Sequence, residues 1–348
     1  MFRQTVLHTF NRYKTLYTHT ISALPVVILM PHSGCNCKCV MCDIWKGNAN
    51  TKQLTEQDVA ALLSSLKKLG TQRVVMSGGE ALLNPNLFKL CALLKKENIK
   101  ITLLSSGIAL KNFAEQIVAH IDDVIISLDG NEIIHNQIRN IPTAFTKLAE
   151  GVASLKVLNK NFRITARTVV QKINFFALND IVTTAQSLGL QQISFLPVDV
   201  STTAFNRPDL LTEDQQRGIA VCRNELPELK IVIQKLIKEQ ADKIGNFIAE
   251  DAAKLMNIYF YYAALHGLNA FPYKKCNAPW VSAVVEADGT VRPCFFHEAY
   301  GNIHKQSFNE IINSANAVNF RKNLNIERSI TCMQCVCSLN LPPTKAIN

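Results

Sequence analysis

Residues 34–45 read GCNCKCVMCDIW, and this stretch decides how the rest of the chain is interpreted. Three of its cysteines, Cys35, Cys39 and Cys42, form a C-x3-C-x2-C pattern, which leaves Cys37 as a surplus thiol. Iron–sulfur clusters are held by cysteine thiolates, and three thiolates on one tight loop can ligate three irons of a [4Fe-4S] cube. No further cysteine follows nearby. The fourth iron is therefore expected to be open, as it is in metal sites that carry out chemistry.

Two structural alternatives use the same residue type. A structural zinc site usually takes two separated C-x2-C pairs rather than three cysteines on one loop. A disulfide framework is typical of short secreted chains, whereas this chain has 348 residues and shows no secretory signal in its first segment. The eleven cysteines therefore predict reduced, metal-binding thiols and a cytoplasmic protein.

The surrounding chain alternates between strand-like and helix-like segments. Short apolar runs are followed by segments in which apolar residues recur at helical spacing. This alternation predicts an α/β fold, in which a parallel sheet has helices outside it. The expected strands are 25–30, 72–76, 99–104, 123–128, 162–170 and 192–197, and the expected helices are 54–69, 86–98, 111–120, 141–158 and 178–188.

Polar motifs fall at the ends of three of these strands, where parallel α/β barrels place their sites. They are Ser77-Gly78-Gly79-Glu80, Ser105-Ser106-Gly107, and Ser127-Leu128-Asp129-Gly130 followed by His135 and Arg139. Glycines let the backbone approach a ligand, and the Glu80 carboxylate suits a cationic amine. Asp129 and His135 fit a direct role or a role as cap and turn residues equally well.

A second set of cysteines lies in the C-terminal part of the chain. Asp288-Gly289, between two β-rich runs, predicts a hairpin that brings Cys276 and Cys294 together, and Cys332 and Cys335 supply two more thiolates. Four thiolates complete the ligand set of an auxiliary [4Fe-4S] cluster, with Cys337 as an alternate for Cys335. A zinc ribbon on the same four residues is the alternative.

The loop and the strand-end motifs together resemble the radical S-adenosylmethionine (SAM) superfamily. The resemblance implies a partial (β/α)6 TIM barrel whose open iron binds the amino and carboxylate groups of SAM. Met41 stands where the family often has an aromatic residue, and Ala81 replaces a common proline. The residues that the resemblance assigns to SAM are Ser77, Gly78, Gly79, Glu80, Ser106, Ser127, Arg139 and Leu196.

The second cysteine set resembles the SPASM/Twitch extension of these enzymes, a small α+β domain. A full SPASM domain uses seven cysteines for two clusters, whereas five are available here, so the one-cluster Twitch form is the better match. The expected division of the chain is an N-terminal extension at 1–22, a radical SAM core at 23–225, a helical linker at 226–274 and an auxiliary cluster domain at 275–340.

The resemblance implies reductive cleavage of SAM to a 5′-deoxyadenosyl radical that abstracts a substrate hydrogen. The auxiliary cluster then accepts an electron or anchors the substrate. A small alcohol- or sugar-like substrate is favoured, in a layout similar to 2-deoxy-scyllo-inosamine dehydrogenase. Peptide-modifying relatives often carry an N-terminal recognition domain, for which the residues before the first strand are too few. Peptide or protein maturation (oxidation or cross-linking) is the alternative, and a non-catalytic iron–sulfur electron carrier is a third.

The composition limits the classes of partner expected for this chain. The net charge of +10 comes from scattered lysines and arginines, without an arginine-rich helix, which favours a basic solvated surface over nucleic-acid binding. The apolar run 24–30 is too short to span a membrane. The expected protein partner is a reductant such as flavodoxin or ferredoxin.

Four further features carry weaker expectations. Arg167 faces the cavity only if the register of its strand turns it inward. The aromatic run 259–262 is expected to pack against the barrel. Cys91 and Cys222 are expected on helices as small buried apolar residues.

Overall fold

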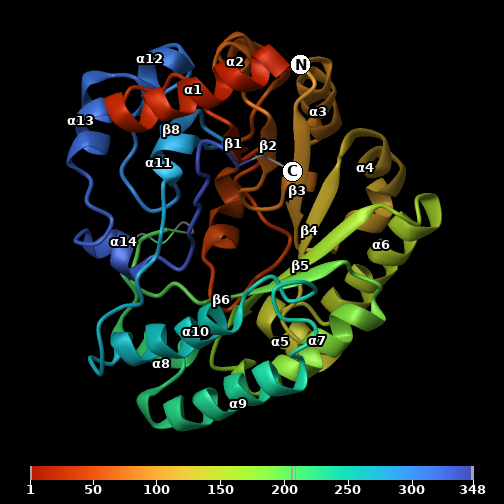
Figure 1. Ribbon diagram of the computed structural model, residues 1–348. Helices are drawn as coiled ribbons and strands as arrows, with labels where there is room; N and C mark the ends of the chain where they lie inside the picture. The colour runs from red at the N-terminus through yellow and green to blue at the C-terminus, as the bar shows by residue number, and fades with distance from the viewer. Residues whose placement is uncertain (1, 205–206, 208, 346–348) are drawn as a thin grey trace.

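A single nine-stranded sheet forms the centre of the molecule in the computed structural model, which describes residues 2–204, 207 and 209–345 (Figure 1). Its strand order is β6-β5-β4-β3-β2-β1-β7-β8-β9, and neighbouring strands from β1 to β6 run parallel. The six parallel strands are β1 (Val26–Leu29), β2 (Arg73–Met76), β3 (Lys100–Ser105), β4 (Asp123–Ser127), β5 (Arg163–Val170) and β6 (Gln192–Pro197). The predicted α/β order of the core is confirmed.

Amphipathic helices cover the outer face of the parallel strands (Figure 1). In α2 (Glu56–Lys68), Val59, Leu62 and Leu66 lie at helical spacing and are fully buried, and a Thr55–Asp58 capping box begins the helix. The same pattern recurs in α3 (Leu87–Lys96), α4 (Ala114–His120), α6 (Ala144–Leu158) and α7 (Leu178–Ser187). The apolar stripes of these helices and the outward side chains of the strands form the core.

Two helices and the segment between them close the far edge of the sheet. After α8 (Glu213–Ile219), α9 (Leu226–Glu239) leads to residues 244–250, which run beside β6 through Ile193 N–H to Phe247 O (2.8 Å). In α10 (Ala252–Leu265), Tyr261 and Tyr262 are buried, and the Tyr262 hydroxyl donates to Val170 O at 2.6 Å. The prediction that this aromatic run packs against the barrel is confirmed for Tyr261 and Tyr262, whereas Phe260 is exposed.

The C-terminal part continues the same sheet. After α11 (Ala278–Val281), β7 (Ser282–Val285) pairs in parallel with β1, and β8 (Thr290–Arg292) and β9 (Gly301–Asn302) follow antiparallel. Gly289 occupies the predicted hairpin turn with φ +83°, a conformation that favours glycine. The helices of this part are α12 (Phe308–Ile312), α13 (Ala315–Asn323) and α14 (Ile330–Gln334).

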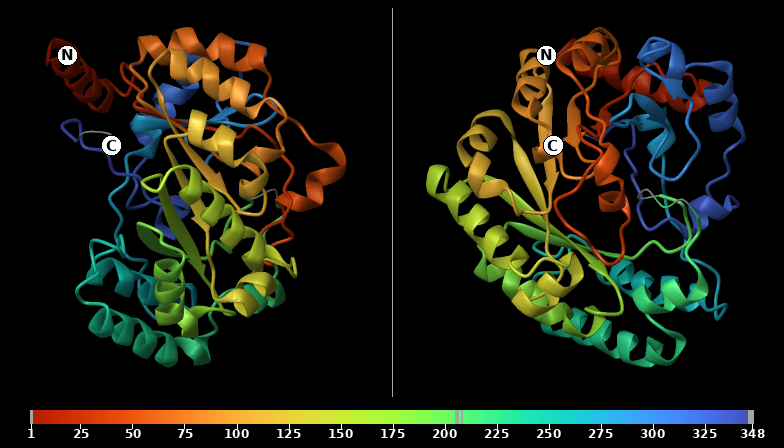
Figure 2. Two further views of the ribbon diagram at one scale, coloured as in Figure 1. Left: turned by 90° about the vertical axis from the view of Figure 1, so that its right-hand side faces the viewer. Right: turned by 180° about the vertical axis from the view of Figure 1, so that it is seen from behind.

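An N-terminal helix, α1 (Phe2–Thr18), lies against this C-terminal part in both views (Figure 1, Figure 2). The Arg12 guanidinium donates to Lys345 O at 2.8 Å and to Pro342 O at 2.7 Å. Arg321 is buried and donates to His19 O at 2.7 Å. The two ends of the described chain are therefore joined by hydrogen bonds of arginines to backbone carbonyls.

Two smaller predictions have different outcomes. Cys91 is fully buried on α3, as expected. The expectation for Cys222 is wrong, because this residue is half-buried in the turn before a 3-10 helix and Lys172 Nζ lies 3.3 Å from its sulfur. Among the described residues, no helix combines the length and apolarity needed to cross a bilayer.

Candidate functional site

A cavity of about 260 Å³ lies at the carboxyl ends of the parallel strands, with the cysteine loop on one side. Its lining includes all four cysteines of the loop, and Val336 and Cys337 reach it from the C-terminal part. The predicted SAM-binding residues that line it are Ser77, Gly78, Gly79, Ser106, Ser127, Arg139 and Leu196. Glu80 is not among the lining residues.

The cysteine loop is fixed to a helix that the sequence did not reveal, α5 (Glu132–Arg139). The backbone N–H groups of Lys38 and Val40 donate to Arg139 O and Ile138 O, both at 3.1 Å. These are carbonyls of the last helical turn, which lack partners inside the helix. Asn140 ends α5 in the left-handed conformation with φ +53°. The end of α5 thus positions the segment of the loop that carries Cys39.

The glycine turn after β2 touches the beginning of the cysteine loop. Gly79 N–H donates to His32 O at 3.2 Å, and Glu80 N–H donates to Gly34 O at 2.9 Å. A Cβ atom on Gly79 would lie 1.9 Å from Gly34 O, so no side chain fits there. The glycine is required for close approach of two backbones, in addition to any approach to a ligand.

The Glu80 carboxylate is buried and bonded within the protein. Its Oε2 accepts from Ser106 N–H (2.8 Å), the Ser106 hydroxyl (2.7 Å) and the Ser105 hydroxyl (3.1 Å). Burial raises the pKa of Glu80, and these hydrogen bonds lower it in part. The Ser106 oxygen also lies 3.1 Å from Asn36 Oδ1, so Glu80 connects β2, β3 and the cysteine loop. Binding of a SAM amine by Glu80 stays a prediction.

The guanidinium of Arg139 forms an ion pair with the buried carboxylate of Asp129. Its Nη2 lies 2.5 Å from Asp129 Oδ2 and its Nε donates to the same oxygen at 2.7 Å, while Nη1 lies 3.5 Å from the Cys39 sulfur. His135, fully buried, accepts from Asp129 N–H through Nδ1 at 3.3 Å. Asp129 and His135 therefore support Arg139 beside the loop, and binding of a SAM carboxylate by Arg139 stays a prediction.

Sequence reasoning missed a second buried ion pair, between Asp199 and Arg207 in the loop after β6. Arg207 Nη1 lies 2.8 Å from Asp199 Oδ2, and Nη2 donates to Met41 O at 2.9 Å. Both residues line the cavity. Met41 lies between Cys39 and Cys42, so Arg207 gives the loop a second anchor besides α5. The sequence offers no signal for this contact, which joins positions 166 residues apart.

The thiols of the loop have different environments. A hydrogen bond with the Cys37 thiol lowers the pKa of Cys39 to about 6, against burial, and the charge of Arg139 lowers it as well. Burial raises the pKa of Cys42 to about 12. Cys37 is buried between Cys35 and Cys39, and its hydrogen bonds to both raise its pKa. The hydrogen bond with Cys37 also lowers the pKa of Cys35, so two of the three motif cysteines favour the thiolate form.

The C-terminal cysteines also lie together. Burial raises the pKa of Cys294 to about 11, and nearby Cys276 and Cys332 raise it further. The Cys335 thiol donates to Cys337 O at 2.8 Å, and Cys337 faces the barrel cavity. Cys276, Cys294 and Cys332 therefore lie near one another, and their role as cluster ligands stays a prediction. Which of Cys335 and Cys337 is a ligand stays a prediction.

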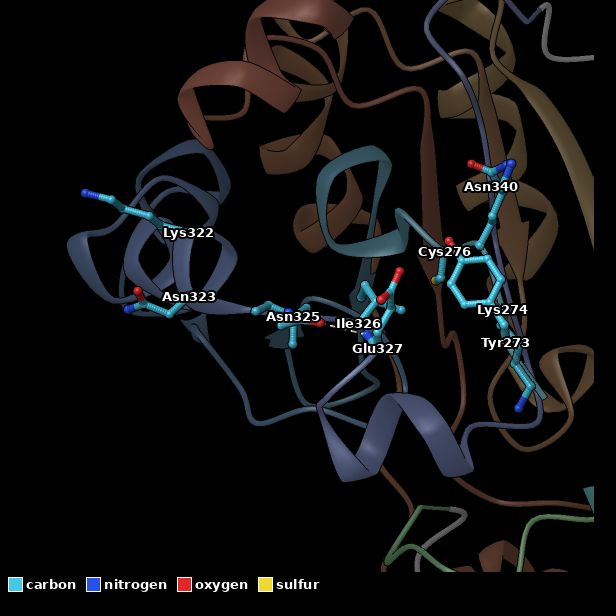
Figure 3. Close-up of a pocket in the computed structure, with 11 residues that line it drawn as sticks. Tyr273, Lys274, Cys276, Lys322, Asn323, Asn325, Ile326, Glu327 and Asn340 are labelled. Atoms are coloured by element: carbon cyan, nitrogen blue, oxygen red, sulfur yellow. Dashed lines mark hydrogen bonds between the residues drawn. The ribbon is translucent and has the colours of Figure 1, made fainter. Parts of the chain in front are cut away.

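A larger hollow of about 820 Å³ lies beside Cys276 (Figure 3). Cys276 lines it, together with Tyr273, Lys274 and polar residues between α13 and α14. The Lys274 ammonium donates to Cys335 O and stands over the Tyr261 ring. The hollow shares no lining residue with the barrel cavity. It is not the place where the loop cysteines act.

The spacing of the donor side chains bears on the zinc alternative. Among the described residues, no three His, Cys, Asp or Glu side chains converge closely enough to bind one metal ion. Four zinc ligands would converge on one point at about 2.3 Å from the metal. The zinc alternative for the second set therefore gains no support from the geometry.

Comparisons with known proteins identify two domains in this chain. Residues 29–175 match the family described as the radical SAM superfamily, and residues 276–336 match SPASM, an iron–sulfur cluster-binding domain. The AdoMet-dependent heme synthase of Methanosarcina barkeri is 24% identical over 83% of this chain and 82% of its own length. The sporulation killing factor maturation protein SkfB of Bacillus subtilis is 21% identical over 83% of this chain and 65% of its own length.

A solved structure shares the fold. Streptococcus suis SuiB, bound to its precursor peptide SuiA, superposes with a TM-score of 0.65 at 14% identity, over 94% of this chain and 73% of SuiB. The two domain matches imply SAM, a [4Fe-4S] cluster with an open site, and auxiliary iron–sulfur ligation. The two domain matches lead to one conclusion: this chain belongs to the radical SAM superfamily, through residues 29–175, and carries a C-terminal SPASM-type cluster-binding domain at residues 276–336.

Proposed function

We propose that this enzyme oxidises its substrate by hydrogen abstraction in the barrel cavity, with the C-terminal cluster accepting the resulting electron. The observation that carries the proposal is the cavity itself, which has Cys35, Cys39 and Cys42 on one wall and Val336 and Cys337 on another. When bound, SAM and its cluster supply a carbon radical that removes hydrogen. A substrate in this cavity lies beside both the cysteine loop and Cys337.

In this proposal the chain's own residues bind and orient. SAM occupies a wall of the cavity formed by Ser77, Gly78, Gly79, Ser106, Ser127 and Leu196. Glu80 and Arg139 hold that wall and the cysteine loop in place. The lining is mainly apolar, with Ile44, Leu104, Val169 and Val198 among its members. Such a lining excludes water, which protects a reactive radical from side reactions.

The proposal leaves two substrate classes open, a small molecule and a peptide. The sequence favours a small molecule, and the name of the Methanosarcina barkeri relative, a heme synthase, is consistent with one. Peptide maturation is the second candidate, because SkfB is named for maturation of a killing factor and the SuiB structure holds a precursor peptide. SkfB and the heme synthase align over equal shares of this chain, so the comparisons do not rank these classes.

Anaerobic reconstitution tests the proposal. We expect about eight irons per chain for two [4Fe-4S] clusters, and 5′-deoxyadenosine when SAM and dithionite are added. The double variant Cys332→Ala/Cys335→Ala should fall to about four irons and still cleave SAM. A reductant such as flavodoxin or ferredoxin is expected to replace dithionite.

Two outcomes would contradict the proposal, each in a different part. Zinc with four irons in the unaltered protein contradicts the electron-accepting role. No 5′-deoxyadenosine under any condition contradicts the enzyme proposal and revives an electron-carrier role. Fractionating a cell extract by ultrafiltration separates the substrate classes, because only the fraction that contains the substrate should stimulate SAM cleavage.

A further inference from the structure

An exposed apolar stripe runs along the outer side of helix α1. Its members are Val6, Leu7, Phe10, Tyr13 and Tyr17, which recur at helical spacing. Phe10 is 64% exposed and Tyr17 is 88% exposed, so the described part of the chain leaves the stripe uncovered. The left view of Figure 2 shows α1 at the edge of the molecule.

The side of α1 that packs on the protein is polar instead. Arg12 is buried and donates to backbone carbonyls near the C-terminal end. Thr15 is also buried, and its hydroxyl accepts from Ser22 N–H at 2.9 Å and from Ala23 N–H at 3.2 Å. A helix that packs on a protein normally turns its apolar side inward, as α2 does. The reversed pattern of α1 is typical of a helix whose apolar side meets a partner.

The charge of α1 is entirely positive. Asp43 is the first acidic residue of the sequence, so the helix contains basic residues and no acidic ones. Lys14 is exposed on the same side as Phe10 and Tyr17, four residues after the first and three before the second. A lysine in this position can lay its aliphatic stem along the stripe and extend its ammonium beyond it.

The neighbouring surface adds to this charge. The His8 ring of α1 lies against the turn before β2, where a Cβ atom on Gly70 would lie 2.7 Å from it. Lys68 stands two residues before that glycine, and Lys100 N–H donates to the backbone carbonyl of residue 72 at 2.9 Å. Both lysines are exposed, and neither forms an ion pair within the described residues.

The acidic residues near these lysines are already paired with other cations. Glu97 lies 3.0 Å from the Lys67 ammonium, and Asp122 lies 2.8 Å from that of Lys95. Asp123 pairs with Arg73 at 2.6 Å. The surface beside the stripe therefore keeps a net positive charge that suits an anionic partner.

We propose that α1 binds an anionic lipid surface. The stripe enters the boundary between headgroups and acyl chains, as the apolar side of an interfacial helix does, and Lys14, Lys68 and Lys100 lie toward the lipid phosphates. Tyrosine rings such as those of Tyr13 and Tyr17 favour the headgroup level. A second copy of this chain fits the stripe less well, because a two-fold contact would bring the same lysines together.

This surface lies at the opposite end of the sheet from the barrel cavity. Lys68 and Lys100 stand at the amino ends of β2 and β3, whereas the cavity lies at the carboxyl ends of the parallel strands. A protein bound through α1 would therefore keep its cavity away from the lipid. The inference is independent of the proposed function, because lipid binding requires neither cluster nor substrate.

Vesicle flotation tests the proposal on the full chain. Vesicles of phosphatidylcholine alone are compared with vesicles of equal parts phosphatidylcholine and phosphatidylglycerol. The variants are Phe10→Ser and Lys14→Gln. Phe176→Ser is the matched control, because Phe176 is 55% exposed and lies outside α1. Light scattering without vesicles measures self-association.

We expect the unaltered protein to bind the anionic vesicles, to bind less at high salt, and to leave the neutral vesicles largely unbound. Phe10→Ser should weaken binding at least about tenfold, the scale of burying a phenylalanine side chain. Lys14→Gln should weaken it about fivefold, the scale of one lysine near an anionic surface. Phe176→Ser should match the unaltered protein, and all variants should keep its melting temperature.

Three results would overturn the proposal. The first is absence of binding to the anionic vesicles, or equal binding to both kinds. The second is an equal loss of binding in Phe10→Ser and Phe176→Ser. The third is a dimer that Phe10→Ser dissociates while vesicles bind nothing, which would assign the stripe to a second copy of this chain.

Discussion

Arg207 links the loop after β6 to the cysteine loop through a buried ion pair. Removing one member of such a pair leaves an unpaired buried charge, at a cost of about 3–5 kcal/mol. We therefore expect Arg207→Met to lower the free energy of unfolding by that order and to lose iron from the first cluster. Anaerobic urea unfolding and iron analysis check both.

The double variant Arg207→Met/Asp199→Leu should recover part of the stability, because no buried charge is left unpaired. It should not recover the iron, since the bond to Met41 O stays lost. Arg217→Met is the matched control, because Arg217 pairs with Asp214 at the surface. Equal stability of Arg207→Met and the control would contradict the role of Arg207.

His135 makes stability depend on pH. Burial lowers the pKa of this imidazole to about 4 and the charge of Arg139 lowers it further, although Asp129 acts in the opposite direction. The unfolded chain, with an ordinary pKa near 6.5, then binds more protons between these values. Stability contributed by the neutral imidazole is present above pH 6.5 and is lost as the pH falls toward 4.

The measurement is the difference in melting temperature between the unaltered protein and His135→Gln across that range. We expect the variant to be less stable at neutral pH and to approach the unaltered protein at the acid end. Parallel curves would show that His135 does not titrate in this window.

At the scale of elements, the strands were predictable and one functional helix was not. Buried apolar runs such as 123–128 specify strands without reference to the rest of the fold, and their bounds agree with the structure within one residue. The sequence indicates the residues of α5 only as a motif that follows β4, because a helix of eight residues is too short to show a clear helical period. The sequence therefore placed Arg139 near the cysteines without showing that Asp129 occupies its guanidinium.

The end of α5 gives an element-scale prediction. Asn140 adopts a left-handed conformation that disfavours residues with a branched Cβ. We expect Asn140→Val to lose about 1–2 kcal/mol and to bind less iron, because the carbonyls that hold Lys38 and Val40 would move. Asn140→Gly, which adopts this conformation freely, should retain iron. Loss of iron in both variants would mean that the side chain matters rather than the backbone.

At the scale of the whole molecule, the sequence predicted a barrel and a separate small domain, whereas the structure joins them in one sheet. The hairpin was predictable from Asp288-Gly289, because a turn signal is local. The pairing of β7 with β1 was not predictable, because nothing in the sequence near Ser282 identifies Val26 as its neighbour. The direction of Arg167 was open for the same reason, since register depends on strands that are distant in sequence. Arg167 lies two residues before Val169, which lines the cavity, so it is on the inward face of β5.

This continuity predicts the effect of removing the C-terminal part. A chain that ends after Tyr273 lacks β7 and exposes the edge of β1, and unpaired edges promote aggregation. We expect such a chain to be insoluble and to hold no cluster at Cys35, Cys39 and Cys42. The control is Cys276→Ala/Cys294→Ala/Cys332→Ala/Cys335→Ala, which keeps the strands and should stay soluble with the first cluster. A soluble truncated chain that binds four irons, about one cluster, would show that the barrel is independent.

The pairing of β1 with β7 also affects how the nascent chain folds. The paired strands lie roughly 250 residues apart, and contacts of such long range slow folding. At about 5–20 residues per second, a ribosome needs roughly ten to fifty seconds to make the intervening chain. Throughout that interval β1 has no partner on one side, so synthesis in the cell is expected to depend on chaperones that hold the unfinished sheet.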